Sequence, residues 1–460
     1  MNRLKIFEYR QCLTDKNVLT DKNVCSTNKS GRVVEQTFLS VILLLILINI
    51  PLSLNAQDKT LSLKQCIDIA LKNNPQIKIA EGSYNATEAN YISALSVLYP
   101  QLGLSAGWTK SGGTSVNGFL VHTGIYENYS TGFQLQQLLY DFGRSNNRIT
   151  GFEDIKKSSK QDLITATQNL ILNTNIAYYN YLQYKRLRDV ADEIVKQDEE
   201  HLKHAKAIYE VGKSARYDVL KAQADLGQAK VNLIAAENNY RLGRLQLINL
   251  LNVKIEDNVD FQDNLDVKQE NVDLNTAFKS AIDNRPEILS IKSIVEADKA
   301  FVSSAWDANL PSISANAGYN WKSLKIQEPF YPSWNIGLNL SVPLFQGFAV
   351  DASVDLAKAN LKSAEATYDL LSQAVKLDVE QQYLSLLQGN ESIKATDLLV
   401  KQTEETLKIA EGRYREGVGS ALEITDARVA VYNSKNAFIQ ALYNYQVTYS
   451  RLIRAMGVLK

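Results

Sequence analysis

Residues 334–344 read WNIGLNLSVPL, a stretch in which large apolar side chains alternate with small or polar ones. Successive side chains of a β-strand point to opposite faces, so the tryptophan, isoleucine and leucines fall on one side of an extended chain. A strand of about ten residues with an apolar face, a polar face and aromatic ends is typical of a strand that crosses a lipid bilayer. A half-buried strand of a soluble sheet shows the same alternation and is the alternative for any one such segment.

Three other segments carry the same two-residue alternation, with aromatic residues toward their ends: 101–108, 128–135 and 312–321. Four matching segments in one chain favour membrane strands over strands of a soluble sheet. The predicted strands are 101–112, 128–140, 312–322 and 333–345.

Four strands do not suffice to close a barrel. An open sheet edge inside a bilayer leaves backbone N–H and C=O groups unpaired, and each such group costs several kcal/mol. The smallest outer-membrane barrels have about eight strands. Membrane strands in this chain therefore require several copies to pool them, and three copies give twelve strands whereas four give sixteen. We expect an oligomer.

After each pair of strands the sequence predicts helices of unusual length. Proline is absent from residues 101–285 and 344–460. An interior proline destabilises a helix by about 3 kcal/mol, so these stretches suit uninterrupted helices. The two longest predicted helices extend about 100 Å each at 1.5 Å per residue. The predicted helices are 144–211 and 348–416, each followed after a glycine-bearing turn by a shorter one, 215–255 and 421–457.

The pattern of strands and helices occurs twice. Pro75 and Pro100 are separated by the same interval as Pro286 and Pro311. Each copy begins with a helix. We expect this helix to cover the part of the long helix that the shorter returning helix does not reach. The predicted division is a first structural repeat, 57–272, opened by a helix over about 61–98, and a second, 273–460, opened by one over about 274–309.

The N-terminal part has the character of a targeting segment. Residues 38–50 (FLSVILLLILINI) form an apolar run with the length of a signal-peptide core, too short to span a bilayer with ease. We assign 38–56 to a signal peptide, with cleavage before Gln57. The preceding residues 1–37 are unusually long and polar for such a signal, and indicate either a start site set too early or an extended leader.

The composition argues against several classes of function. Fifty basic and fifty acidic residues leave a net charge of zero, and no basic stripe marks a nucleic-acid partner. Three cysteines supply neither a disulfide framework nor a CxxC metal pattern. Asp141-Phe142-Gly143 matches a kinase triplet without its companion loops, and we predict a strand-to-helix turn there. We expect no enzyme, no bound cofactor and no resident metal.

Two turn sequences and the closing segment carry a resemblance to a known family. The turns read YEVGKSARYDVLKAQADL at 209–226 and YREGVGSALEITDARVAV at 414–431, and the chain closes with YNYQVTYSRLIRAMG. Together with the doubled strand–strand–helix block, they resemble the TolC-type outer-membrane efflux proteins over essentially all of 57–460. The resemblance implies a mainly α-helical chain with membrane β-strands, in which a homotrimer forms a twelve-stranded β-barrel stacked on a long periplasmic α-helical barrel.

The resemblance also implies a function, a location and partners. It implies an outer-membrane channel of a tripartite efflux or type I secretion system, acting as a passive exit duct that extends into the periplasm of a bacterium. Substrates would arrive from an inner-membrane transporter of the RND, ABC or MFS type through a periplasmic adaptor, a membrane-fusion protein. The barrel would contact outer-membrane lipid, and the strand loops 109–127 and 322–333 would lie outside the cell.

By the same resemblance, the adaptor would dock on the two helical turns. The family's turn motif contains a leucine that both turns of this chain lack, which sets their docking chemistry apart from the family pattern. The implied docking residues are Val211, Gly212, Lys213 and Ser214 in the first turn and Gly417, Val418 and Gly419 in the second.

Glu423 and Asp426 follow the second turn and, three residues apart, share one face of a helix start. In the resembling family, acidic residues at this place ring the tunnel mouth. Three copies would supply six carboxylates, a constriction that attracts cations, sets charge preference and gates the duct. The alternative is the ordinary preference of acidic residues for a helix N-terminus. Asp218, at the equivalent place in the first turn, is expected to be structural.

Two other interpretations remain. A periplasmic coiled-coil scaffold or adaptor without a pore would also use long helices. A metal-specific efflux channel would use His201 and His204, which stand three residues apart on one helical face. These histidines lie in the charged run KQDEEHLKHAK, for which a solvated helix face is the stronger expectation.

Overall fold

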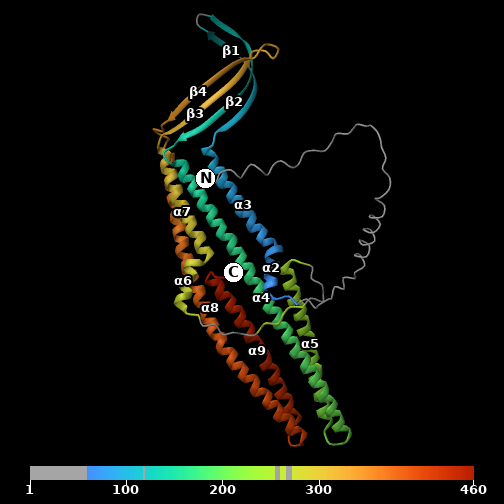
Figure 1. Cartoon of the computed structure of the whole chain (residues 1–460). Helices are drawn as coiled ribbons and strands as arrows, with labels where there is room; N and C mark the ends of the chain where they lie inside the picture. The colour runs from blue at the N-terminus through green and yellow to red at the C-terminus, as the bar shows by residue number, and fades with distance from the viewer. Residues whose placement is uncertain (1–59, 118–119, 254–259, 266–271, 460) are drawn as a thin grey trace, which may run out of the picture. The chain divides into compact units, whose positions relative to one another are not determined.

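The computed structural model describes residues 60–117, 120–253, 260–265 and 272–459, all within one unit, Asp58–Lys460 (Figure 1). The predicted leader and signal peptide, 1–37 and 38–56, lie outside the described residues. The described chain consists of long helices and one antiparallel β-sheet. None of the described helices has both the length and the apolar character needed to cross a lipid bilayer.

The helices follow the same order in both halves of the chain. α4 (Arg144–Glu210) and α8 (Ala349–Arg415) are each 67 residues long. The others are α2 (Leu63–Asn73), α3 (Pro75–Leu95), α5 (Arg216–Leu251), α6 (Leu274–Asn284), α7 (Pro286–Trp306) and α9 (Ala421–Ala455). This order confirms a mainly helical chain with an internal two-fold repeat.

Each repeat opens with two helices where the sequence predicted one. Proline lacks a backbone N–H and disfavours a helical conformation in the residue before it. Asn74 and Arg285 accordingly take extended conformations, with ψ of 128° and 122°. The helix restarts at Pro75 and Pro286, where a first-turn N–H has no intrahelical partner to lose. The single opening helices predicted over 61–98 and 274–309 are therefore wrong at these breaks.

The C-terminal ends of α5 and α9, the helices that return from the two turns, lie against these breaks. In the first repeat, Asn74 Nδ2 donates to Leu250 O at 3.0 Å, and Asn252 Nδ2 donates to Asn73 O at 3.1 Å. In the second, Ser280 Oγ donates to Met456 O at 3.1 Å. The returning helices α5 and α9 thus meet the opening helices end to end, and each pair packs along a 67-residue helix.

The four strands form one antiparallel sheet in the order β1-β2-β3-β4. Their bounds are β1 (Gln101–Asn117), β2 (Leu120–Tyr140), β3 (Ser312–Ser323) and β4 (Tyr331–Ser341). β2 and β3, from different repeats, pair at the centre, so β1 and β4 are the two edges. β4 ends before Pro343, short of the predicted 345, because proline cannot donate to the strand ladder.

The hairpin of β1 and β2 is longer than predicted. Its pairing runs without interruption from Gln101 opposite Gln136 to Asn117 opposite Leu120. The prediction of a loop over 109–127 is therefore wrong. The glycines and serines of this segment are typical of loops, but its threonines, valines and isoleucine favour a β-strand. The loop predicted over 322–333 narrows to residues 324–330.

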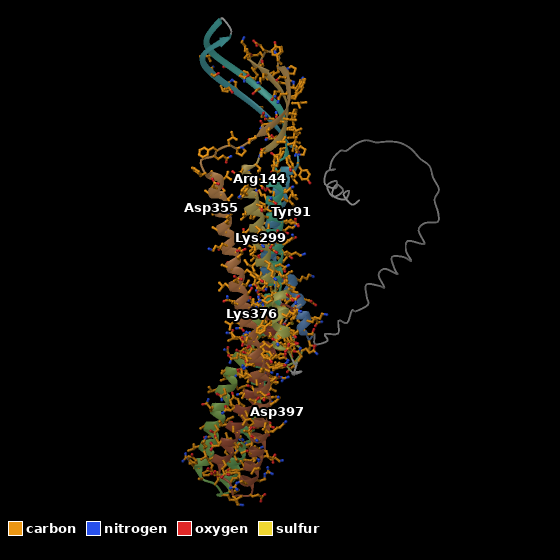
Figure 2. The ribbon with its side chains drawn as sticks, turned by 90° about the vertical axis from the view of Figure 1, so that its left-hand side faces the viewer. Tyr91, Arg144, Lys299, Asp355, Lys376 and Asp397 are labelled. Atoms are coloured by element: carbon orange, nitrogen blue, oxygen red, sulfur yellow. The ribbon has the colours of Figure 1, made fainter. Side chains whose placement is uncertain are left out.

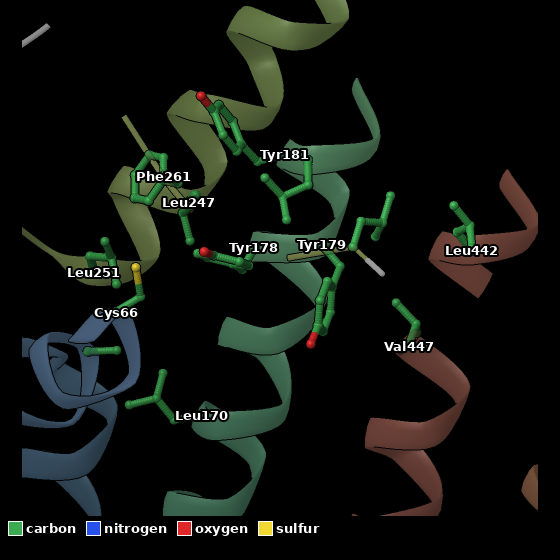
Figure 3. Close-up of a cluster of buried hydrophobic side chains, with 13 residues drawn as sticks. Cys66, Leu170, Tyr178, Tyr179, Tyr181, Leu247, Leu251, Phe261, Leu442 and Val447 are labelled. Atoms are coloured by element: carbon green, nitrogen blue, oxygen red, sulfur yellow. The ribbon is translucent and has the colours of Figure 1, made fainter. Parts of the chain in front are cut away.

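A buried cluster surrounds the middle of α4 (Figure 3). Tyr178 and Tyr181 pack edge-on against Phe261, with ring centroids 6.1 and 4.9 Å apart. Tyr181 Oη donates to Asp260 Oδ1 at 2.7 Å, which satisfies its buried hydroxyl. Cys66 of α2 is fully buried in the same cluster, and burial raises the pKa of its thiol to about 12. The cluster fixes α2, α5 and residues 260–265 to the long helix.

Candidate functional site

The apolar residues of the four strands gather on one face of the sheet. The register aligns Leu102, Leu135, Ala317 and Ile336 in one row across the strands. Ile336 is 78% exposed, and Leu338 on the same face is 75% exposed. Leucines and isoleucines exposed to this degree over a whole sheet face mark a surface for lipid or protein rather than for water.

Aromatic side chains mark both ends of this apolar face. Level with the end of β3 that is far from the helices, the rings of Trp108 and Tyr129 lie 6.5 Å apart across β1 and β2. At the helix end, the rings of Tyr140 and Phe142 lie 4.7 Å apart. An apolar band between two aromatic girdles is the surface pattern of a transmembrane β-barrel.

The first helical hairpin turns at the predicted docking residues. Gly212 takes a left-handed conformation with φ of 76°. Its N–H donates to Tyr209 O at 2.9 Å, and the N–H of Lys213 donates to Ile208 O at 3.0 Å. This pair of bonds is the usual way for a glycine to close a helix. Val211 is 67% exposed, so the turn presents an apolar side chain to its surroundings.

The second hairpin repeats this turn. Gly417 has φ of 75°, its N–H donates to Tyr414 O at 3.0 Å, and the N–H of Val418 donates to Arg413 O at 3.0 Å. Val418 is 69% exposed. Gly419 packs so closely that a Cβ there would lie 2.9 Å from Tyr414 N. This close approach explains why position 419 is a glycine, whereas the equivalent position of the first turn is Ser214.

Glu423 and Asp426 are both exposed in the first turns of α9. Ser420 Oγ accepts a hydrogen bond from the N–H of Glu423 at 3.2 Å and so caps the helix. The Glu423 carboxylate lies 3.3 Å from Arg413 Nε at the end of α8. The predicted acidic pair therefore shares one exposed surface, together with an arginine that sequence reasoning missed.

Farther from the turns, a group of polar side chains that we call the polar junction links the two repeats. Arg428 of α9 lies 3.1 Å from Asp198 of α4 and 3.2 Å from Glu411 of α8. Thr425 Oγ1 of α9 donates to Asp225 Oδ2 of α5 at 2.9 Å. The polar junction therefore connects both helical hairpins, α4–α5 and α8–α9, near their ends.

Burial governs the ionisation of the polar junction. Burial raises the pKa of Asp198 above its ordinary value, although the nearby Arg428 lowers it. His201 is 8% exposed, and its ring lies 6.1 Å from that of Tyr414. Burial first, and then the charge of Arg428, lower the pKa of His201. His204 is exposed as predicted, whereas the prediction of a solvated face is wrong for His201.

The polar junction could not be read from local sequence. Asp198 and Arg428 are 230 positions apart, and each lies in a run whose charges resemble a solvated helix face. The one available signal was the comparison of the repeats. The first repeat has Gln223 at the place of Arg428 and Lys221 at the place of Asp426, so the two hairpins differ in charge just past their turns.

Comparison with known proteins identifies the family. The model of the family described as "Outer membrane efflux protein" matches residues 66–253 and 277–458. The Outer membrane protein TolC of Escherichia coli (strain K12) is 26% identical over 444 residues, covering 91% of this chain and 86% of that protein. The Cation efflux system protein CusC of the same strain is 25% identical over 425 residues, covering 86% of each.

A solved structure shares the fold. The CmeC outer membrane channel of Campylobacter jejuni matches with a TM-score of 0.76 at 21% identity, over 86% of this chain and 85% of that chain. The fold class predicted from the strand and helix patterns is thus confirmed, and the family match confirms a transport role, not an enzymatic one, at the outer membrane. The chain belongs to the outer membrane efflux protein family and is an outer-membrane channel of the TolC type that extends into the periplasm.

Proposed function

We propose that three copies of this chain form the passive exit duct of a tripartite efflux or type I secretion system. β1 and β4 are the open edges of a four-stranded sheet, and open edges are unfavourable in lipid. Pairing β4 of one copy with β1 of the next closes twelve strands around three copies. The exposed apolar face with its two aromatic girdles supports this arrangement.

A stripe of leucines on α8 supports a matching assembly of the helices. The stripe consists of Leu356, Leu370, Leu377, Leu384 and Leu398, which recur at multiples of seven residues and are each at least 55% exposed. A seven-residue apolar repeat is the seam of a left-handed coiled coil, which a facing helix covers. The single copy leaves the stripe exposed, so we assign the facing helix to a neighbouring copy.

The two helical turns are the proposed docking surface for a periplasmic adaptor. Each turn exposes one apolar side chain beside its glycine: Val211 directly precedes Gly212, and Val418 directly follows Gly417. Equivalent turns repeated in three copies would offer six docking places to adaptor hairpins. Through the adaptor the channel would receive substrate from an inner-membrane transporter of the RND, ABC or MFS type.

Glu423 and Asp426 are proposed to line the periplasmic entrance and to favour cations there. Arg413, 3.3 Å from Glu423, offsets part of the glutamate charge. Asp426 therefore carries the larger share of the effect. We propose that opening the entrance separates the two hairpins of each copy, which the polar junction holds together.

The cargo is proposed to be chosen by the transporter. One matched relative bears the name of a cation efflux protein, but the names of the other reported matches specify no metal. Within the described part of this chain, no three His, Cys, Asp or Glu side chains are grouped so as to hold a metal ion. We therefore place a general exit duct ahead of a metal-specific channel.

The observation that carries the proposal is the exposed leucine stripe together with the open sheet edges. In detergent, native mass spectrometry is expected to give a trimer, and planar bilayers to give stepwise conductance. Leu370→Glu combined with Leu377→Glu should abolish both, because six carboxylates would be buried in the seam. Lys358→Glu, exposed on the same helix outside the stripe, serves as the control and should keep both. A monomer without conductance would favour the pore-free scaffold.

The docking proposal has a separate test in living cells. A photocrosslinking residue placed at Lys213 or Val418 should capture a periplasmic adaptor, identified by mass spectrometry. The same residue at Lys394, exposed on α8 but far from the turns along the helix, should capture none. Recovery of no adaptor from either turn would argue against docking there.

A further inference from the structure

The polar face of the sheet is uncharged over most of its length. Residues 101–109, 128–137, 312–321 and 333–342 contain no Asp, Glu, Lys, Arg or His. Charged side chains are instead spread along the helices, as Figure 2 shows for Lys299, Asp355 and Lys376. The polar face, which we call the carboxamide face, carries Gln101, Asn128, Gln134, Gln136, Asn316, Asn320, Asn335 and Asn339 among glycines and hydroxyls.

Glycines on neighbouring strands keep three of these carboxamides against the wall of the sheet. Gly318 is directly opposite Asn335 in the register, and a Cβ on it would lie 2.7 Å from Asn335 Oδ1. A Cβ on Gly132 would lie 2.3 Å from Asn320 Oδ1, and the equivalent contact of Gly337 is 3.2 Å from Asn316 Oδ1. These three side-chain amides therefore lie over glycine residues and do not project from the sheet. The carboxamide face is accordingly an uncharged wall with few protruding side chains.

A lysine, Lys322, lies on the carboxamide face at the end of β3 that is far from the helices. Lys322 pairs with Ser130 on one side and Tyr331 on the other, in the same alternation as Asn320 and therefore on the carboxamide face. β3 begins at Ser312, directly after the helices, so Lys322 lies at its far end.

The other lysines at this end of the sheet are already paired. Lys110 lies 2.9 Å from Glu127, and Lys325 lies 3.0 Å from Glu328. By the alternation, Lys110 belongs to the apolar face, opposite to that of Lys322. The net positive charge of this end of the sheet therefore comes from Lys322.

We infer that Lys322 sets a second, basic charge filter at the outer mouth of the barrel, separated from the acidic entrance by the uncharged carboxamide face. This inference rests on the proposed trimer, in which three copies place three lysines around the mouth. Charges at the rim of a pore with low-dielectric walls attract or repel ions according to sign. A cation that passes Glu423 and Asp426 thus meets an opposing charge before it leaves, whereas a neutral solute meets none.

The test is the permeability ratio of potassium to chloride, measured from reversal potentials of the purified trimer in planar bilayers. Lys322→Gln should raise this ratio by about twofold or more in 0.1 M KCl. The difference should shrink in 1 M KCl, where the screening length falls from about 10 Å to about 3 Å. The control, Lys325→Gln combined with Glu328→Gln in the adjoining turn, removes an ion pair without changing the net charge and should change the ratio much less.

The outcomes separate this inference from the proposed channel. A conducting trimer whose ratio is unchanged by Lys322→Gln, or changed equally by the double variant Lys325→Gln and Glu328→Gln, overturns the basic filter and does not affect the proposed channel. A wild-type protein without conductance overturns the duct itself. Asn335→Ser tests the wall: the ratio should stay constant, and a shift would show that charge selection involves the carboxamide face after all.

Discussion

The two repeats join their returning helix to their opening helices with the same geometry and different chemistry. In the first joint, the carboxamides of Asn74 and Asn252 donate to backbone carbonyls at 3.0 and 3.1 Å. In the second joint, Arg285 is 8% exposed and lies 3.3 Å from Glu287 and 2.8 Å from Asp378. Arg454 of α9 contacts the same Glu287.

The difference determines how each joint responds to substitution. A carboxamide that loses one hydrogen bond costs about 1 kcal/mol, because no charge is left buried. A buried ion pair that loses one partner costs about 3–5 kcal/mol, because the remaining charge stays out of water. The second joint is therefore expected to be the more sensitive of the two, although both perform the same structural task.

The largest effect is expected from Glu287→Gln, which leaves Arg285 and Arg454 facing a neutral side chain. We expect the free energy of unfolding to fall by about 3 kcal/mol. Asn74→Ser, which removes the bond to Leu250 and still offers a helix cap, should lower it by about 1 kcal/mol. Urea titration of the solubilised protein, followed by circular dichroism, measures both. Equal losses would contradict the contrast between the joints.

A reciprocal exchange sharpens the comparison. Gly457 and Asn252 occupy equivalent left-handed positions, with φ of 75° and 50°. A Cβ on Gly457 would lie 2.6 Å from Arg285 N, so Gly457→Asn should destabilise by about 2 kcal/mol through overpacking. Asn252→Gly loses one hydrogen bond and should cost about 1 kcal/mol. The thermal midpoints should rank in this order, and the reverse order would show that the second joint has room for a side chain.

The helical turns offer a third contrast. Ser420 caps α9, whereas Ala215 precedes α5 without a side-chain cap. Ser420→Ala should speed amide hydrogen exchange in the first turn of α9, in line with a loss of about 1 kcal/mol. Ala215→Ser should slow exchange at the start of α5 by a similar factor. Unchanged exchange in both variants would mean that contacts between the hairpins, not the caps, hold these helix ends.

The smallest effect is expected from pH. An unfolded histidine has a pKa of about 6.5, and burial lowers the folded pKa of His201 below that value. As pH falls below the unfolded value, the unfolded chain takes up the proton first, so stability is lost. The unfolding midpoint of the wild-type protein should be lower at pH 5.5 than at pH 8. His201→Gln should reduce this difference. His204→Gln, three residues away and exposed, should leave the loss intact.

The sequence predicted the features that depend on local chemistry. Long runs without proline predicted α4 and α8, and the two-residue alternation around Trp334 predicted the apolar sheet face. The breaks before Pro75 and Pro286 were missed, although the rule that prolines interrupt helices applied there. The length of the β1–β2 hairpin was missed because its glycines and serines outweighed its β-branched residues in the interpretation.

Contacts between the repeats lay beyond prediction from a single sequence. Asp198 and Arg428, or Arg285 and Asp378, are brought together only when the helices pack. Charged residues are usually solvated, so nothing in their local surroundings marked Asp198 and Arg285 as buried. The resemblance to the family led to Glu423 and Asp426, but it did not reveal Arg413 beside them.

The buried thiol described with the core cluster has a practical consequence. Cys66 is the single cysteine of the sequence beyond residue 56. Alkylating reagents react with the thiolate, and a fully buried thiol with a pKa of about 12 supplies almost none at neutral pH. In protein that begins at Gln57, a cysteine introduced at exposed Val418 would therefore be the one that accepts a fluorophore or a spin label. Site-directed labelling of the helical turns in this folded form therefore does not require replacement of Cys66.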